Sequence, residues 1–557
     1  MTLPSQFSRE STRIDANIAS RTDAGTASAG FTDRSQSRFA SGPAIVLYIA
    51  AAKLLLHLSM VARYGIFRDE MYYLACSRHM AWGYVDHPPF TVWIAWFSRV
   101  VLGDSPLGVR LLPILAGAAV VWLAGALARE MGGGRFAQGL AALAVFVVPL
   151  YLVAHTWLTD NVFEQLIWMA CIWLVVRAMN TNDARYWLWF GVAAGLGFEN
   201  KYSIAFLLLG LLVGVVLTSH RHFLKSRYLW LGVLACAVIS LPNLLWQVRY
   251  HFPFLELIHN IRMSQRDVVR GPVAFIADQA MVMNPVLFPL WVGGLAWLFF
   301  GKHSQSADSR SDESSRGAGR YRLFGWTYVV VLGAFIALKA KNYYVAPIYP
   351  ILFAAGAIGL ERLAAGRRIG TWMRSAYVAV VIVVGALLMP LSVPLLSPEN
   401  FIRYENALGL KPPEIEHQQN GPLPQWYADE FGWQEMVEKV AKVYNSLPPE
   451  ERARTAIFSN GWGEAAAVDF YGPRYGLPQA ISKHNSYWLW GPDKYDGSTM
   501  IILRSDGRNE PKLFQSVEVV GHVEHPYARR DEFFDIFLCR GMKANLRDAW
   551  PKLKVFD

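Results

Sequence analysis

Long apolar segments recur between residues 43 and 396, and this pattern excludes an ordinary soluble fold. About eleven of them approach the roughly 20 residues that a helix needs to cross the hydrocarbon core of a bilayer. The predicted spans are residues 43–61, 107–128, 136–154, 161–176, 186–199, 202–219, 228–246, 273–300, 323–339, 344–360 and 375–396. The chain is 53% hydrophobic and only 17% charged. Together these features predict a polytopic α-helical membrane protein with about eleven transmembrane helices.

The two ends of the chain differ from this apolar region. Residues 1–42 are rich in Ser, Thr, Ala, Arg and Asp and lack an apolar stretch, which predicts a disordered tail rather than a signal peptide. Residues 398–557 carry more charge and mix strand-like stretches such as "TAIFSN" and "MIILRS" with the helical stretch "QEMVEKVAKVYNSL". We therefore predict a membrane domain over residues 43–397 and a small α/β domain outside the membrane over residues 398–557.

Loop charges predict the orientation of the chain. Lys and Arg residues fall on one side of the membrane if the helices alternate, in the tail, in loops 129–135, 177–185 and 221–227, and in segments 301–322 and 362–374. The positive-inside rule makes that side cytoplasmic, so the opening loop and residues 398–557 are expected in the periplasm, outside the inner membrane. Loop 247–272 breaks the pattern with four Arg residues. Either the count of spans slips there, or these cations face an external anion.

Several other classes find no support in the sequence. The net charge is +10, but the Lys and Arg residues form no basic stripe, so nucleic acid is not an expected partner. The four cysteines lie far apart without metal-ligand spacing, which implies neither a disulfide framework nor a zinc site. The chain has no Walker loop and no dinucleotide-binding glycine pattern, so a nucleotide-driven pump is not indicated.

Ionisable and aromatic side chains gather at the predicted outer ends of the helices. The set comprises Asp69, Glu70, Asp86, His87, His155, Asp160, Asn161, Glu199, Lys201, Lys339, Lys341, Tyr343 and Tyr344. An ionisable group near hydrocarbon is costly unless it is paired or functional. The set therefore predicts a site on the outer face of the membrane for an anionic lipid head group and a polar partner.

The two acids of the opening loop have different expected roles. Asp69 precedes the predicted helix "EMYYLACSRHM", where an Asp also serves as a simple N-cap. Tyr73 and Cys76 lie near the face of Asp69 on that helix, whereas Glu70 points about 100° away. We expect at most one of the two acids to enter a pocket.

The other candidate residues also have purely structural interpretations. Asp86 and His87 precede two prolines in "DHPPF", and an ordinary extended turn explains them equally well. Asp160 follows Thr159 at a helix start and could be a cap. Lys201 in "GFENKYS" could extend to the membrane surface or pair with Glu199. The stretch "KNYYVAPIYP" could be an interfacial aromatic belt.

Taken in order, these motifs resemble a known family. The series "RDEMYYL", "WGYVDHPPF", "TWLTDN", "GLGFENKYS" and "KNYYVAPIYP" resembles the bacterial members of glycosyltransferase family 39, the protein O-mannosyltransferase-like enzymes. It is more distantly similar to the lipid A aminoarabinose transferases. The resemblance covers roughly residues 43–400, and "GEAAAVDFYGPRYGLPQAISKHNSYWLWGP" is similar to the outer C-terminal domain of many such enzymes.

The resemblance implies a GT-C fold embedded in the bilayer and a specific reaction. A sugar passes from a polyprenyl-phosphate donor to an extracytoplasmic glycolipid, polysaccharide or protein, with inversion at the anomeric carbon. It implies that Asp69 is the catalytic base, that Asp160 is a second catalytic carboxylate that supports the site, and that Lys201 binds the donor phosphate. The remaining expected substrate-binding residues are Glu70, Tyr73, His87, Lys341, Tyr343 and Tyr344.

One departure from the family pattern concerns the "DHPPF" motif. The aminoarabinose enzymes have a Lys where this chain has His87. This difference leaves open whether Asp86 and His87 contact a divalent metal ion instead of a phosphate. Two other classes of protein remain as alternatives. A flippase for lipid-linked sugars would also need a charged cavity, although its broken helices would meet near the midplane. A scaffold with an outer binding domain would leave the acids unexplained.

Overall fold

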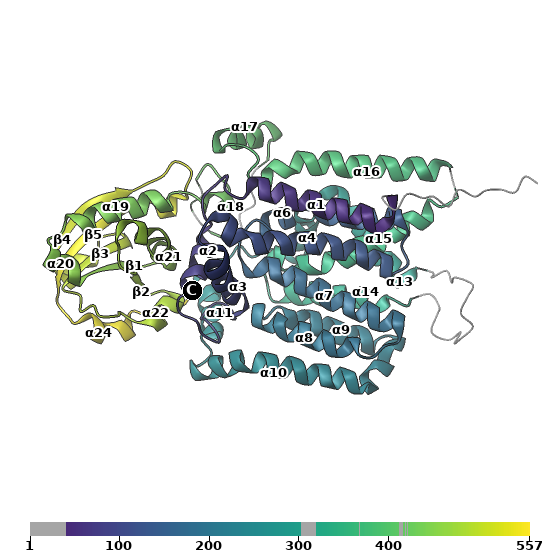
Figure 1. Ribbon diagram of the computed structural model, residues 1–557, viewed down its shortest axis with the longest axis horizontal. Coiled ribbons are helices and arrows are strands. Elements are labelled where there is room, and N and C mark those ends of the chain that lie inside the picture. Colours follow the sequence, from purple (N-terminus) through teal and green to yellow (C-terminus); the bar gives the residue numbers. More distant parts are fainter. Residues whose placement is uncertain (1–39, 302–318, 367, 411–415, 418, 420) are drawn as a thin grey trace, which may run out of the picture.

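The computed structural model describes all residues except 1–39, 302–318, 367, 411–415, 418 and 420. Most of the predicted N-terminal tail lies outside the described residues. A bundle of long helices forms one part of the molecule, and a sheet flanked by short helices lies at one end of that bundle (Figure 1). Helices α2 (Arg68–Cys76), α3 (Phe90–Phe97), α11 (Pro253–Ser264) and α18 (Gln425–Ala428) lie between the two parts.

The bundle confirms a multi-pass helical membrane protein. Its helices are α1 (Gly42–Met60), α4 (Pro106–Glu130), α5 (Arg135–Val147), α6 (Pro149–Ala154), α7 (Asp160–Thr181), α8 (Tyr186–Asn200), α9 (Ile204–Val216), α10 (Arg227–Arg249), α12 (Pro272–Val282), α13 (Phe288–Phe300), α14 (Arg322–Ala337), α15 (Tyr349–Leu363) and α16 (Arg368–Leu388). In the described part of the chain, 6 helices are long and apolar enough to cross a membrane, or up to 8 if each bent pair is one span. The count of eleven stays a prediction.

One predicted span is bent rather than straight. The segment predicted at 273–300 consists of α12 and α13, which meet at an angle of 102°. Asn284 adopts a positive φ of 72° at the break. Pro285 follows it and has no amide hydrogen to continue the helical hydrogen bonds. The physical cause of the bend is therefore local to this Asn-Pro pair.

The predicted sheet is present in the C-terminal part. Its order is β2-β1-β3-β5-β4, with β1 (Thr455–Ser459) parallel to β2 (Ile481–Ser482) and β3 (Thr499–Ser505). Strand β5 (Phe534–Met542) is antiparallel to β3 and to β4 (Phe514–Val523). The accompanying helices are α17 (Pro398–Leu408), α19 (Trp433–Ser446), α20 (Pro449–Arg454), α21 (Trp462–Tyr471), α22 (Asn485–Trp490), α23 (Glu510–Leu513) and α24 (Leu546–Ala549).

One hydrophobic cluster spans the membrane part and the C-terminal part. Helix α2 packs against α21. Met71 and Tyr72 of α2 belong to the same buried cluster as Ala465 and Val468 of α21 and Ile501 of β3. The sheet domain is therefore fixed to the loop that opens the candidate site, and it does not hang from a linker.

Helices α13 and α15 approach each other closely through glycine. A Cβ atom at Gly294 would collide with the carbonyl oxygen of Leu352, and one at Gly356 would collide with that of Leu290. By contrast, a Cβ at Gly293 would meet no described atom within 4 Å. Small residues that let backbones approach are a usual basis of helix packing within membranes.

We predict that Gly294→Leu destabilises the bundle, because its side chain would have to enter the α13–α15 contact. Overpacking of this kind costs about 1–3 kcal/mol or more. The thermal unfolding midpoint of the purified protein in detergent measures the effect. Gly293→Leu, one residue away on the same helix, is the matched control and should unfold near the wild-type temperature. Equal midpoints for the two variants would contradict the packing argument.

Candidate active site

A large cavity lies where the helical bundle meets the C-terminal part. Its volume is about 1860 Å³, larger than the ~300–1,000 Å³ of typical small-molecule sites. Its walls come from the ends of α7, α9 and α14, from α11, and from segments of the C-terminal part. The cavity brings together Asp69, Asp86, Asp160, Asn161, Lys201, Lys339, Lys341, Tyr343 and Tyr344 from the predicted set.

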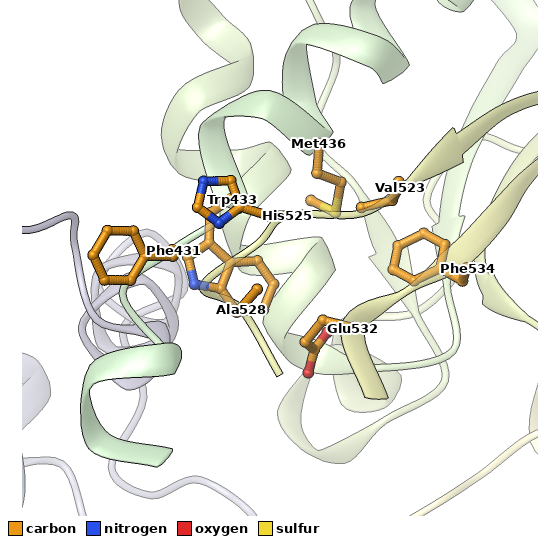
Figure 2. A pocket seen from close by; sticks show the side chains of 9 residues that line it. Phe431, Trp433, Met436, Val523, His525, Ala528, Glu532 and Phe534 are labelled. Carbon is orange, nitrogen blue, oxygen red and sulfur yellow. The ribbon is translucent and has the colours of Figure 1, made fainter. Parts of the chain in front are cut away.

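A second, much smaller pocket lies within the C-terminal part (Figure 2). It is lined by Phe431, Trp433, His525 and Phe534, among others. Its volume of about 10 Å³ is close to the space that one water molecule needs. This pocket is therefore too small for a sugar or a lipid head group.

Asp69 faces the large cavity from the first turn of α2. The N-cap of this helix is Phe67, whose backbone N–H donates to Glu70 Oε2 at 2.9 Å. Asp69 is therefore not the cap, and its side chain is 40% exposed. Burial among protein atoms raises the pKa of Asp69, while Arg68 lowers it, with a net pKa of about 6. A carboxylate with this pKa is ionised at neutral pH and accepts a proton readily.

Glu70 points away from the cavity, as the helical spacing predicts. Its carboxylate and the Arg110 guanidinium are fully buried, with Arg110 Nη2 2.7 Å from Glu70 Oε2. The same guanidinium nitrogen lies 3.1 Å from Glu430 Oε2. Burial raises the pKa of Glu430 to about 8, since a single arginine faces both acids. Glu70 was expected to bind substrate, but its position indicates that it joins α2, α4 and the C-terminal part.

Tyr73 and His87 also lie outside the cavity. Both are buried, and their ring centroids are 4.6 Å apart. The His87 ring also lies 5.0 Å from the Tyr84 ring, and its Nδ1 lies 3.0 Å from the carbonyl oxygen of Pro88. Their burial does not support the expected contacts with substrate. Instead these rings form the packed base on which the "DHPPF" turn rests.

Asp86 lines the cavity and accepts a hydrogen bond of 3.0 Å from the Tyr72 hydroxyl. His87 Nε2 lies 3.8 Å from the same carboxylate. Among the residues that the structure describes, no three His, Cys, Asp or Glu side chains are grouped to hold a metal ion. Within the described residues, Asp86 therefore has no neighbouring group of such ligands that would complete the metal site considered for it.

Lys201 lies between two acids of α7. Its Nζ is 3.5 Å from Asp160 and 3.3 Å from Glu164, and it donates to Asn161 Oδ1 at 2.6 Å. It also lies 5.1 Å from the centroid of the Tyr344 ring. The predicted alternative partner, Glu199, is buried and does not line the cavity. Lys201 therefore joins the start of α7 to the end of α8 on the cavity wall.

Lys341 belongs to a second group of charged residues that line the cavity. Its Nζ lies 2.6 Å from Glu416 and 3.3 Å from Asp267. Burial raises the pKa of Glu416, but Lys341 and Arg266 together bring it down to about 2. Tyr343 and Tyr344, two and three residues further along the chain, line the cavity with their rings nearly perpendicular and 4.9 Å apart.

Some residues of the site were absent from the predicted set. Glu164 follows Asp160 by four residues on the same helical face, and this spacing was a usable signal. Arg68 adjoins Asp69 in the sequence. Glu416, Asp429 and the other cavity residues of the C-terminal part lie in segments without any pattern that links them to the opening loop.

Comparison with known families supports the predicted resemblance. The family model for dolichyl-phosphate-mannose-protein mannosyltransferase matches residues 86–246. An undecaprenyl phosphate-alpha-4-amino-4-deoxy-L-arabinose arabinosyl transferase of Pseudomonas fluorescens is 28% identical over 201 residues, which is 34% of either chain. A lipid A galacturonosyltransferase of Rhizobium johnstonii is 23% identical over 226 residues, 40% of this chain and 47% of that protein. The chain thus matches less than half the length of these two relatives.

One solved structure has the same architecture. It is the crystal structure of ArnT from Cupriavidus metallidurans bound to undecaprenyl phosphate. The TM-score is 0.57 at 16% sequence identity, and the alignment covers 88% of this chain and 97% of that one. The fold is therefore the expected GT-C fold. Together the comparisons confirm the predicted resemblance to membrane-embedded sugar transferases, distantly including the aminoarabinose transferases.

The buried acids around Arg110 generate a prediction about stability. We expect Arg110→Leu to destabilise the protein by about 3–5 kcal/mol, because both carboxylates lose their buried cation. The loss should grow from about pH 8 to about pH 10, since the wild-type Glu430 ionises beside Arg110 above about pH 8 whereas the variant's Glu430 must keep its proton, and a further raised acid pKa in the folded state lowers stability as pH rises. Thermal unfolding in detergent at both pH values measures it.

A matched control for this variant lies at the other end of the bundle. Arg177 pairs with Glu130 at 2.9 Å, but both side chains are partly exposed. Arg177→Leu should cost only ~0–1 kcal/mol, as surface pairs do. Similar losses for the two variants would contradict a special role for the buried group.

Proposed function

We propose that this protein is an inverting glycosyltransferase that uses a polyprenyl-phosphate sugar as donor. The observation that carries the proposal is the position of Asp69 in one cavity with Asp160, Lys201 and Lys341 at the outer end of the helices. The names of the two curated relatives indicate an undecaprenyl-phosphate-linked sugar as donor and lipid A as acceptor. Here the acceptor is a hydroxyl of an extracytoplasmic glycolipid, polysaccharide or protein.

In this proposal the reaction is a single displacement. The acceptor oxygen forms a bond with the anomeric carbon while the bond from that carbon to the phosphate oxygen breaks. Asp69 takes the acceptor proton as the bond forms, and the electron pair leaves with polyprenyl phosphate. Attack from the face opposite the phosphate inverts the anomeric carbon. Cations near the leaving phosphate stabilise its growing negative charge.

The cavity offers cations for that second task. Lys201 is already balanced by Asp160 and Glu164, so its charge alone is a weak attraction for a phosphate. Arg262 and Lys339 line the same cavity. In the proposed complex these residues and Lys201 surround the phosphate, and Asp160 keeps Lys201 in place. The four Arg residues of loop 247–272 then belong to an outer loop that faces an anion.

The orientation is also part of the proposal. The cavity is lined in part by segments of the C-terminal part, and the sheet of that part lies at one end of the bundle (Figure 1). The positively charged loops near residues 129–135 and 221–227 follow the C-terminal ends of α4 and α9, at the end of the bundle opposite the cavity. We place that opposite end in the cytoplasm and the cavity in the periplasm, with the helices in the inner membrane.

A flippase is the competing interpretation, and the bend between α12 and α13 is a feature that a transporter would share. Pro285 at this bend lines the cavity. However, a transporter does not require a proton acceptor beside the sugar, whereas Asp69 is placed as one. Loss of transfer with retained lipid binding on replacement of Asp69 therefore separates the two functions.

The test of the proposed function is Asp69→Asn. This change keeps the shape of the side chain and removes its basicity, so we expect turnover to fall by ~10²-fold or more. Mass spectrometry first identifies the outer glycoconjugate that a deletion strain lacks, and the initial rate of its formation in membrane vesicles is then measured. In the wild type, kcat/KM should fall below about pH 6, where Asp69 takes up a proton. A variant rate near that of the wild type would exclude Asp69 as the base.

A further prediction concerns Lys201. We expect Lys201→Ala to weaken the binding of undecaprenyl phosphate by about tenfold or more, equivalent to ~1.4 kcal/mol, because Asp160 and Glu164 would then face the phosphate without a cation. Equilibrium binding to the purified protein measures this. Lys225→Ala, an exposed lysine of the segment after α9, is the control. Unchanged affinity of the Lys201 variant would remove this residue from the phosphate site.

A further inference from the structure

Arg68 is the immediate neighbour of the proposed base and extends toward the C-terminal part. Its Nε lies 3.7 Å from Asp69 Oδ1. Within the described residues, it is the one cation inside 4 Å of that carboxylate. The other charged groups that act on Asp69 are acids: Asp429 before α19, Glu416 before α18, and Asp160 at the start of α7. Arg68 is thus the main influence that favours the ionised form of the base.

The C-terminal part holds the Arg68 guanidinium from several sides. Its two terminal nitrogens lie 3.9 Å from Asp429 and 3.9 Å from Glu532. The guanidinium carbon is 4.7 Å from the centroid of the Trp462 ring, which is a cation–π contact. The backbone N–H of Arg68 also donates to the carbonyl oxygen of Asp429 at 3.1 Å.

The aliphatic part of Arg68 depends on a glycine of α21. A Cβ atom at Gly463 would lie 2.8 Å from Arg68 Cδ and 3.1 Å from its Cγ. The side chain therefore passes directly over Gly463 on its way to the acids. The acids themselves are anchored, since Arg529 Nε lies 2.6 Å from Asp429 and its Nη2 lies 2.7 Å from Glu532. Arg68 has little freedom to leave Asp69.

We propose that Arg68 is a positioning residue through which the C-terminal domain orients the Asp69 carboxylate and keeps it ionised. The inference rests on the proposed function of Asp69 as the base and adds a control of that base by another domain. Arg68 itself need not touch the donor or the acceptor. Helix α21 and the segments that carry Asp429 and Glu532 hold the Arg68 side chain. The position of the docked domain therefore determines where the Arg68 guanidinium lies relative to Asp69. Loss of these contacts would free the Arg68 guanidinium to move away from Asp69, which would then lose the cation beside it.

The experiment measures the protonation of Asp69 directly, in the full-length protein in detergent. Infrared spectra recorded from pH 4 to pH 9 contain the C=O band of each protonated carboxyl group, and Asp69→Asn identifies the band of Asp69. In Arg68→Gln we expect the midpoint of this band to rise by about one pH unit or more, because loss of a nearby opposite charge favours the protonated acid. Arg68→Lys keeps the charge and should stay closer to the wild type.

Gly463→Ala tests the same contact without changing any charge. The added methyl group must push the Arg68 side chain aside, so the midpoint should rise in the same direction. This variant also decides the question if Arg68→Gln does not fold. Arg540→Gln is the matched control, since Arg540 lies 2.6 Å from Glu451 in the C-terminal part and does not line the cavity. Its midpoint should equal that of the wild type.

The outcomes separate this inference from the proposed function. A midpoint that does not move in Arg68→Gln or Gly463→Ala would overturn the inference, even if the variants unfold at lower temperature. Rising midpoints, together with an acid limb of the transfer rate that moves to higher pH by the same amount, would support it. If the midpoints rise but Asp69→Asn transfers sugar normally, the proposed role of Asp69 fails while the electrostatic contact of Arg68 stands.

Discussion

The buried contact of Glu70, Arg110 and Glu430 is the constraint on which the rest of the site depends. Arg110 belongs to a long membrane helix, Glu70 to the short helix of the opening loop, and Glu430 to the C-terminal part. Buried ion pairs seldom add much net stability, because the charges must leave water. Their geometry is nevertheless specific, since few other arrangements satisfy all three groups. This contact fixes α2 at one place and one rotation between bundle and sheet.

That rotation decides which acid of the "RDE" stretch meets the cavity. Adjacent residues of a helix point about 100° apart. With Glu70 held on Arg110, Asp69 points about 100° away from Glu70 around α2, toward the cavity that Lys201 and Lys341 also line. The ion pair of Glu70 with Arg110 therefore determines the direction in which Asp69, the proposed base, points. The packing of the Tyr73 ring against the His87 ring stabilises the same orientation of α2.

Much of this arrangement could be predicted from the sequence, and the exceptions have physical causes. Apolar length located most of the long helices, because a bilayer demands it, but the bend at Asn284 and Pro285 depends on a local break that length does not reveal. Helical spacing separated Asp69 from Glu70. It could not show that His87 is enclosed, because its burial comes from Tyr84 and from the fold of the turn. Glu416 and Asp429 were beyond reach, since only tertiary contact brings them near Asp69.

The shared core of α2 and α21 has a consequence for how such proteins diversify. Met71 and Tyr72 pack with Ala465 and Val468 in one cluster, so a substitution on either helix changes the surface that the other must match. The C-terminal domain cannot be exchanged among relatives as an independent module. A chimera would have to carry its own opening loop with it, so this domain is inherited together with the helix that bears the proposed base.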